Sequence, residues 1–186
     1  RDSRAVRQRV EQQEQLGLAV ERMRAADYVA AERMARAVLK AQPSSVDAYT
    51  VLAAIQSSAG NAAAAGESYR KAAELEPGRG DLLNNYGAWL CANGHPAEAL
   101  VWFDRALADA GYGTPAAALA NAGGCALQSG QNERAQRGLR RALELDPINA
   151  YALESMARSE YRQGRYFEAR AFSQRRLAAA SATPSV

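Results

Sequence analysis

The sequence predicts an all-α protein built from stacked pairs of antiparallel helices, and three periodic features predict it. Alanines recur at intervals of 34, 34, 36 and 34 residues, and a second series of small residues keeps this spacing 12 positions upstream. Turn-forming residues recur 5 positions upstream of the first series. Repetition of this kind is typical of solenoids, in which each unit buries its apolar face only against its neighbours. The series are Ala31, Ala65, Ala99, Ala135, Ala169; Ala19, Ala53, Gly87, Gly123, Ala157; and Ala26, Gly60, Gly94, Gly130, Gly164.

Each element of a unit follows from these positions. The small residues let the two helices of a pair approach closely, and the glycine ends the first helix in a tight turn. Prolines at Pro43, Pro77 and Pro147 end the second helix. This pattern is that of the tetratricopeptide repeat (TPR), so we expect a right-handed TPR superhelix of about five repeats. A single array over residues 1–183 is predicted, with repeats at about 12–45, 46–79, 80–115, 116–149 and 150–183.

The two ends and one connection depart from the period. The first helix of the first repeat has no clear pattern, and the third repeat is longer through the connection 110–115. From Ala178 onward the chain is expected to be disordered or truncated, with residues 184–186 as a tail outside the array. Because residue 1 is Arg rather than Met, we expect a processed or truncated form.

The distribution of charge excludes some partners. The net charge of +3 is mild, and the segments 47–59, 81–93 and 117–129 contain no Lys or Arg. These segments are the first helices of three repeats, which line the concave groove of a TPR array. A neutral groove argues against nucleic acid, whose phosphates need several cations, and against TPR proteins that grip a terminal carboxylate. Most arginines lie on the first helix and on the second helices of the repeats.

Motifs for chemistry are absent from the sequence. The one histidine, His95, lies in a turn, without a second histidine or a thiol near it in sequence. No phosphate-binding glycine loop, nucleophile elbow or metalloprotease motif occurs. We expect no catalysis, no cofactor and no metal site. No run of 18 apolar residues is present.

Two cysteines and a group of asparagines carry more specific hypotheses. Cys91 and Cys125 lie 34 residues apart on the first helices of adjacent repeats, where either a disulfide or two buried thiols would fit. Asn is a poor residue in the middle of a helix unless its amide has a role. That role is either bonding to a neighbouring helix or gripping the backbone of a bound peptide. The residues predicted to contact a partner in the groove are Asn84, Asn85, Ala88, Asn121, Leu127, Gln128, Glu154, Arg158 and Tyr161.

One segment and one connection resemble a particular family. The run 82–91, Leu-Leu-Asn-Asn-Tyr-Gly-Ala-Trp-Leu-Cys, is similar to the third repeat of the PilF/PilW family of type IV pilus biogenesis TPR proteins. The long connection with Tyr112, Thr114 and Pro115 resembles that family's insertion. The similarity covers about residues 14–178. It departs from the family in stopping after five repeats, where the family usually has six.

The resemblance implies a location and a role. Members of the family are outer-membrane lipoproteins facing the periplasm, and they act as pilotins for the pilus secretin PilQ. The lipidated cysteine would lie upstream of Arg1, so membrane contact would come only through that missing anchor. The family pairs cysteines between its third and fourth repeats, which implies a disulfide between Cys91 and Cys125. We expect a monomer whose partner is PilQ.

Two other functions remain open from the sequence. The chain could be a general TPR adaptor for another peptide, or the recognition module of an enzyme complex.

Overall fold

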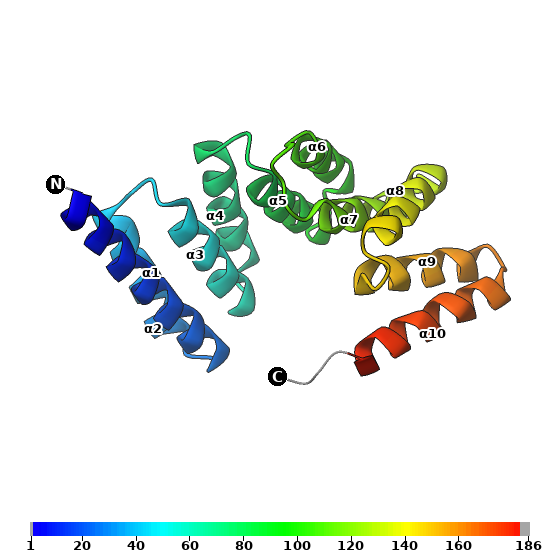
Figure 1. Ribbon diagram of the computed structural model, residues 1–186, viewed down its shortest axis with the longest axis horizontal. Coiled ribbons are helices and arrows are strands. Elements are labelled where there is room, and N and C mark those ends of the chain that lie inside the picture. Colours follow the sequence, from blue (N-terminus) through cyan, green and yellow to red (C-terminus); the bar gives the residue numbers. More distant parts are fainter. Residues whose placement is uncertain (1, 183–186) are drawn as a thin grey trace. The chain divides into compact units, whose positions relative to one another are not determined.

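The computed structural model describes residues 2–182, and every regular element among them is an α-helix. Short turns join consecutive helices over most of this range, as Figure 1 shows. The helices are α1 (Asp2–Arg24), α2 (Tyr28–Ala41), α3 (Val46–Ser58), α4 (Ala62–Leu75), α5 (Gly80–Ala92), α6 (Pro96–Leu107), α7 (Pro115–Gln128), α8 (Asn132–Leu145), α9 (Ala150–Arg162) and α10 (Tyr166–Ala182).

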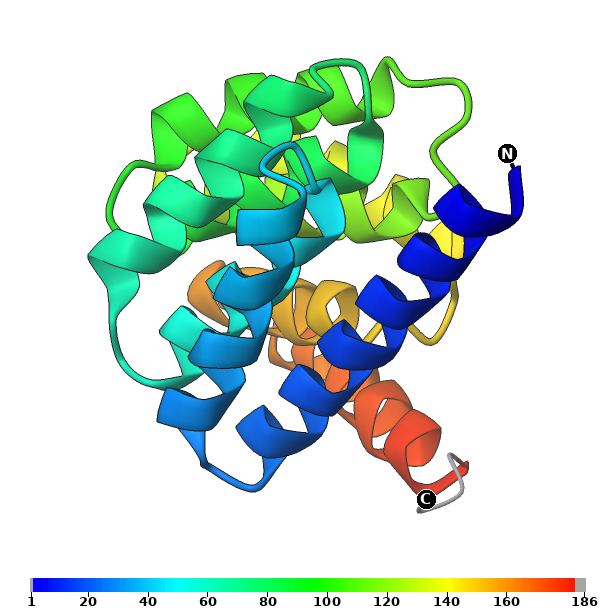
Figure 2. The ribbon, with the colours of Figure 1, turned by 90° about the vertical axis from the view of Figure 1, so that its left-hand side faces the viewer.

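The helices associate as consecutive pairs, as the repeat spacing predicts, and they form two compact units. Unit 1 ends at Pro77 and contains α1–α4, whereas unit 2 begins at Gly78 and contains α5–α10. Within unit 1, α1 packs against α2 and α3, and α3 packs against α4 (Figure 2). Within unit 2, α7 packs against α6 and α8 and also contacts α5 and α9. The first helices of three successive pairs in unit 2, α5, α7 and α9, are therefore neighbours.

The recurring small residues are the points where paired helices touch. A Cβ atom added at Gly87 would lie 2.8 Å from Phe103 Cε1, and one at Gly123 would lie 2.6 Å from Leu139 Cγ. Real Cβ atoms do not approach other atoms so closely, so both pairs depend on glycine at these positions. The recurring alanines are buried as well: Ala31, Ala65, Ala99 and Ala135 are 0% exposed, and Ala169 is 7% exposed.

The turns inside the repeats share one backbone conformation. A residue with positive φ follows the first helix of each pair, which is the usual way for a helix to end. Four of the five are glycines, but the first repeat uses an alanine, for which this conformation is strained. The φ angles are +62° at Ala26, +82° at Gly60, +89° at Gly94, +76° at Gly130 and +77° at Gly164.

Both ends of the described chain are more helical than the sequence pattern indicates. The first helix is continuous from Asp2 to Arg24, so it begins well before residue 12, and it is not irregular. The last helix continues to Ala182, so the expected disorder from Ala178 is wrong as far as Ala182. Alanine is the strongest helix former, and an alanine-rich run needs little packing to remain helical. The predicted tail at 184–186 lies outside the described residues.

The longer connection of the third repeat folds back onto its own unit. Asp109 Oδ2 accepts a hydrogen bond from the backbone nitrogen of Gly80 at 2.8 Å. A Cβ atom at Gly80 would lie 2.7 Å from Tyr112 Cγ, so the tyrosine ring covers the start of α5. The extra residues thus help to fix α5, which carries Asn84 and Cys91.

None of the described helices is both long enough and apolar enough to cross a membrane.

Candidate functional site

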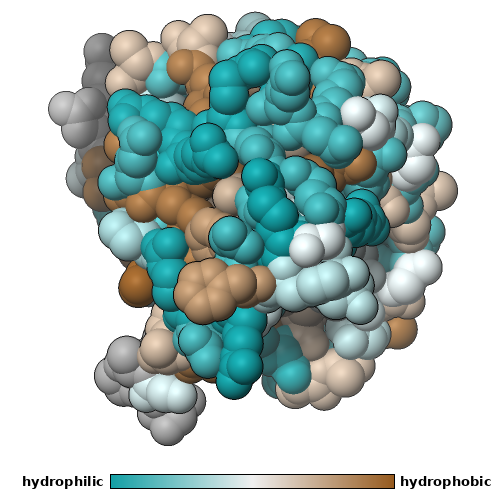
Figure 3. All heavy atoms as spheres, turned by 90° about the vertical axis from the view of Figure 1, so that its right-hand side faces the viewer, coloured by the Kyte–Doolittle hydropathy of each residue, from teal (hydrophilic) through white to brown (hydrophobic). Residues whose placement is uncertain are grey.

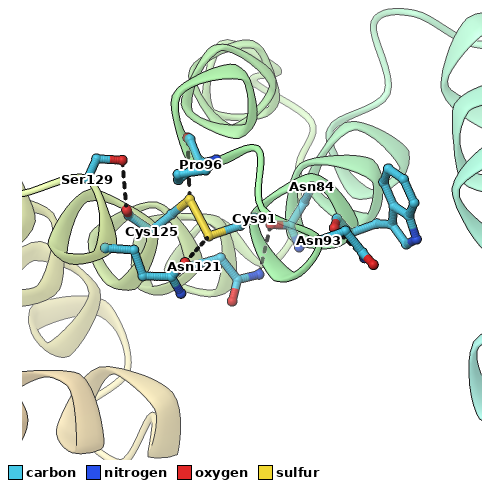
Figure 4. The surroundings of a disulfide bond; sticks show 9 residues. Asn84, Cys91, Asn93, Pro96, Asn121, Cys125 and Ser129 are labelled. Atoms are coloured by element: carbon cyan, nitrogen blue, oxygen red, sulfur yellow. Dashed lines mark hydrogen bonds between the residues drawn. A yellow bond between two sulfur atoms is a disulfide. The ribbon is translucent and has the colours of Figure 1, made fainter. Parts of the chain in front are cut away.

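Two asparagine side chains join α5 to α7 at the centre of unit 2. Asn121 Nδ2 donates a hydrogen bond to Asn84 Oδ1 at 3.1 Å (Figure 4). Asn84 is 9% exposed, and Asn121 is half-buried. This bond accounts for asparagine at both positions, because it satisfies a buried amide in the middle of a helix.

The same pair keeps one donor and one acceptor free. Asn84 Nδ2 and Asn121 Oδ1 make no hydrogen bond within the described residues. Among those residues no buried side-chain nitrogen or oxygen lacks a partner, so these two atoms are not sealed from solvent. An extended peptide presents one N–H and one C=O group per residue. The amide pair therefore offers the complementary groups, and both roles considered for the asparagines are compatible with the structure.

A disulfide lies beside the amide pair. Cys91 on α5 and Cys125 on α7 are bonded, with 5.9 Å between their Cα atoms (Figure 4). Cys91 is 8% exposed and Cys125 is 0% exposed. The carbonyl oxygen of Pro96, at the start of α6, lies 3.4 Å from Cys125 Sγ. The covalent bond holds the two helices that carry the asparagines at a fixed separation.

The disulfide also forms part of the wall of a small pocket. Its volume is about 110 Å³, similar to that of apolar cavities that hold one small ring. We call it the amide pocket, and its lining residues come from α5, α6, α7 and α9: Ala88, Cys91, Ala92, Phe103, Asn121, Gln128 and Tyr151.

Tyr151 in this pocket was not identified from the sequence. Its ring lies over Gly124 on α7, where an added Cβ would be 2.6 Å from Tyr151 Cε1. The signal for this contact is the second glycine of the pair Gly123-Gly124. One glycine accommodates the partner helix of the same repeat, and the next accommodates an aromatic ring from the following repeat.

A second and larger hollow lies between α9 and α10. Its volume is about 490 Å³, and it is mainly apolar, with two arginines. Tyr161 and Tyr166 make an edge-on ring contact in it, with centroids 5.2 Å apart. On the side of unit 2 that carries α8–α10, apolar and hydrophilic side chains are interspersed (Figure 3). We call the hollow between α9 and α10 the tyrosine hollow. It is lined by Ala157, Arg158, Tyr161, Tyr166, Ala169, Arg170 and Ser173.

The predicted groove residues thus separate into groups. Ala88, Asn121 and Gln128 meet in the amide pocket. Arg158 and Tyr161 lie in the tyrosine hollow.

The remaining predicted residues have other environments. Asn85 is half-buried and makes no side-chain hydrogen bond within the described residues. Glu154 accepts a bond from Arg176 Nε at 3.0 Å, so its charge is compensated. Leu127 is 8% exposed, close to the 9% of Asn84, and its contact with a partner stays a prediction.

In unit 2 the first helices of the three pairs are α5, α7 and α9, and two of them carry no cation. The sequences of α5 and α7 contain no Lys or Arg, so the amide pocket is lined by neutral groups. On α9, the arginine that lines the tyrosine hollow, Arg158, forms no ion pair with a described residue. The electrostatic character therefore changes from neutral at the amide pocket to positive at the tyrosine hollow.

The described residues contain no group of three or more His, Cys, Asp or Glu that could hold a metal ion. His95 is exposed at the N-terminal cap of α6.

Consecutive helix pairs that pack on one another define a helical-repeat scaffold. A sequence model of the tetratricopeptide repeat matches residues 46–79. With five helix pairs of that spacing along the described residues, the chain belongs to the tetratricopeptide-repeat family. Repeat proteins of this kind generally use their extended surfaces to bind protein partners.

Solved structures similar to this chain include those of PilW and PilF. The crystal structure of PilW, described as a widely conserved type IV pilus biogenesis factor, is 32% identical, with a TM-score of 0.84. The match covers 93% of this chain and 79% of PilW. PilF of Pseudomonas aeruginosa is 24% identical, with a TM-score of 0.82, over 92% of this chain and 78% of PilF.

A more distant neighbour supports the fold alone. YrrB, described as a TPR protein with an unusual peptide-binding site, is 18% identical, with a TM-score of 0.65 over 90% of this chain and 86% of YrrB. Comparison with curated protein sequences gave no match.

Proposed function

We propose that this chain is a non-enzymatic scaffold of type IV pilus biogenesis, and that it acts as a pilotin by binding a segment of the secretin PilQ. The observation that carries the proposal is the surface formed by α5 and α7, where a free amide donor and acceptor lie beside the 110 Å³ pocket. The similarity to PilW, a type IV pilus biogenesis factor, supports the choice of pathway.

The binding mode follows from the chemistry of this surface. The backbone of an extended PilQ segment would bond to Asn84 Nδ2 and Asn121 Oδ1, while one apolar side chain enters the amide pocket. Main-chain bonds then supply affinity and the pocket supplies specificity, as in other modes of peptide recognition. The disulfide between α5 and α7 fixes the pocket before binding, which reduces the ordering cost of association.

The tyrosine hollow would receive a polar or charged end of the same segment. Arg158 and Arg170 there have no ion-pair partner among the described residues, and a carboxylate on PilQ would compensate them.

The disulfide also supports a location. Disulfides persist in oxidising compartments, including the bacterial periplasm. We place the protein at the periplasmic face of the outer membrane, held there by a lipid anchor upstream of residue 1.

Titration of the purified periplasmic portion of PilQ tests the proposal. Gln128 is exposed and lines the amide pocket, so Gln128→Ala should leave the fold intact while it changes the pocket. A lost hydrogen bond costs about 0.5–1.5 kcal/mol, which corresponds to a roughly two- to twelvefold weaker affinity.

The matched control is Arg137→Glu on α8, an exposed position outside both hollows, and it should bind PilQ as the wild type does. If the control abolishes binding while Gln128→Ala has no effect, the amide pocket is not the PilQ site. If PilQ does not bind the wild-type protein at all, the pilotin role is wrong.

A further inference from the structure

Unit 1 contains a surface hollow that the proposed function does not use. It lies between α2, α3 and α4, and its volume is about 500 Å³. We call it the lysine hollow, because its lining includes Lys40 and Lys71, the only two lysines in the 186-residue sequence. Every other basic side chain of the sequence except His95 is an arginine.

The other charges at the lysine hollow are already compensated within the chain. Arg36 donates to Glu32 Oε1 at 2.8 Å, one turn away on the same helix. Glu67 accepts from Arg70 at 2.8 Å. The hydrogen bond from Arg70, and then its charge, lower the pKa of Glu67, so this carboxylate stays ionised beside its arginine.

The two lysines are the charges that remain. Neither ammonium group forms an ion pair with a described residue. The Nζ atom of Lys71 lies 5.7 Å from the centroid of the Tyr49 ring, an arrangement that positions the side chain without neutralising it. Glu67 is the one acidic side chain of the lining, and the charge of Lys71 adds to the lowering of its pKa. Arg36, Lys40 and Lys71 outnumber it, so the hollow keeps a net positive charge.

The other lining groups favour a ligand with an apolar stem. Leu52 is 3% exposed where it lines the hollow. Beside it, Ser68 Oγ donates to Gln56 Oε1 at 2.6 Å, so these two buried polar groups satisfy one another. A carboxylate on a short aliphatic chain matches this combination, because its stem would meet Leu52 while its oxygens reach the ammonium groups.

We propose that the lysine hollow is a second docking site, for an acidic segment of a partner protein, rich in Glu and Asp. Charge complementarity selects this occupant, since the two unpaired ammonium groups face the same hollow. The site is chemically distinct from the amide pocket, which is lined by neutral groups. A partner that binds at the lysine hollow would be held mainly by charge, so salt would weaken its binding.

The presence of only two lysines allows a direct test on the whole chain. Reductive methylation with ¹³C-formaldehyde labels Lys40, Lys71 and the terminal amine and keeps their positive charge. The probe is the blocked peptide acetyl-Glu-Leu-Glu-Glu-Leu-Glu-amide, and the control peptide has Gln in place of every Glu. We expect both lysine signals to shift together with the acidic peptide and to stay in place with the control peptide.

Matched variants measure the effect on affinity by fluorescence anisotropy of the labelled acidic peptide. Lys40→Gln with Lys71→Gln should weaken binding roughly fivefold, the scale expected for losing two exposed ion pairs. Arg137→Gln with Arg140→Gln removes the same charge from exposed positions on α8 and should change affinity by less than about twofold.

Three results would overturn the proposal. The first is equal shifts with the two peptides, and the second is equal loss of affinity in the two double variants. The third is a response of the lysine signals to phosphatidylglycerol vesicles without a response to the acidic peptide, which would make the hollow a lipid contact. All variants change exposed side chains, and unchanged thermal unfolding verifies that they remain folded.

Discussion

Two adjacent glycines on α7 provide a sharp test of the amide pocket, because alanine should have a different effect at each. At Gly124, an added Cβ would lie 2.6 Å from the ring atoms Cε1 and Cζ of Tyr151. Tyr151 is 37% exposed, so the far end of its ring can move away. Shifting a side chain off its preferred rotamer costs about 0.5–1.5 kcal/mol, and replacing glycine by alanine within a helix gains about 1 kcal/mol. The free energy of unfolding should therefore change by less than about 1 kcal/mol.

The neighbouring position has no such freedom. An added Cβ at Gly123 would lie 2.6 Å from Leu139 Cγ and 3.2 Å from the carbonyl oxygen of Ala135. Leu139 is 0% exposed, and the second contact is with backbone, so α8 itself would have to move. Overpacking of this kind costs about 1–3 kcal/mol. Over most of this range the cost exceeds the gain of about 1 kcal/mol in helix propensity, so Gly123→Ala should be less stable than the wild type.

The two variants should thus separate stability from binding. Gly124→Ala moves Tyr151, a wall of the amide pocket, and should weaken PilQ binding about tenfold, as expected for losing most of one buried apolar contact. Gly123→Ala should lower the free energy of unfolding, measured by urea denaturation followed by circular dichroism. Calorimetric titration with the periplasmic portion of PilQ measures the binding. Wild-type affinity in Gly124→Ala would refute the role of the pocket, and equal stability of the two variants would refute the packing argument.

Three further predictions concern stability and salt. Ala26→Gly should raise the free energy of unfolding by about 1 kcal/mol, because φ is +62° at Ala26. Gly60→Ala should lower the free energy of unfolding, because it places a side chain at a positive φ. A change of the same sign in both variants would contradict the strain argument. Replacing Cys91 and Cys125 by alanine should cost about 3–4 kcal/mol by the loop-entropy estimate, with hydrogen exchange accelerated in α5–α8 and unchanged in α1–α4. PilQ binding at the amide pocket should change little between low and physiological salt, and a steep loss would point instead to a charged surface.

The fold was predictable from the sequence because its determinants are local and repeat. A helix pair needs small residues where its helices cross, and Gly87 and Gly123 mark those crossings at the same spacing as the alanines. The turn at Gly94 needs positive φ, which glycine adopts freely. The extent of α1 was not predictable in this way, because most of that long helix is exposed and has no regular apolar face.

The candidate site was only partly predictable. The position of a residue within its own repeat does not show which residues of the following repeat pack against it. Gln128 and Asn121 line the amide pocket, and their contact with a partner stays a prediction. Leu127, beside Gln128 in sequence, is only 8% exposed. Tyr151 enters the pocket from that following repeat, and its role depends on a packing contact with Gly124 that a pattern within one repeat does not show.

Site-specific photo-crosslinking to PilQ tests the central claim most directly. A benzoyl-phenylalanine placed at Gln128 samples the mouth of the amide pocket, and one placed at Arg137 samples an exposed position of α8 outside both hollows of unit 2. The account predicts a covalent adduct with PilQ from position 128 and none from position 137. An adduct from position 137 alone would contradict it, because the working surface would then lie away from the amide pocket.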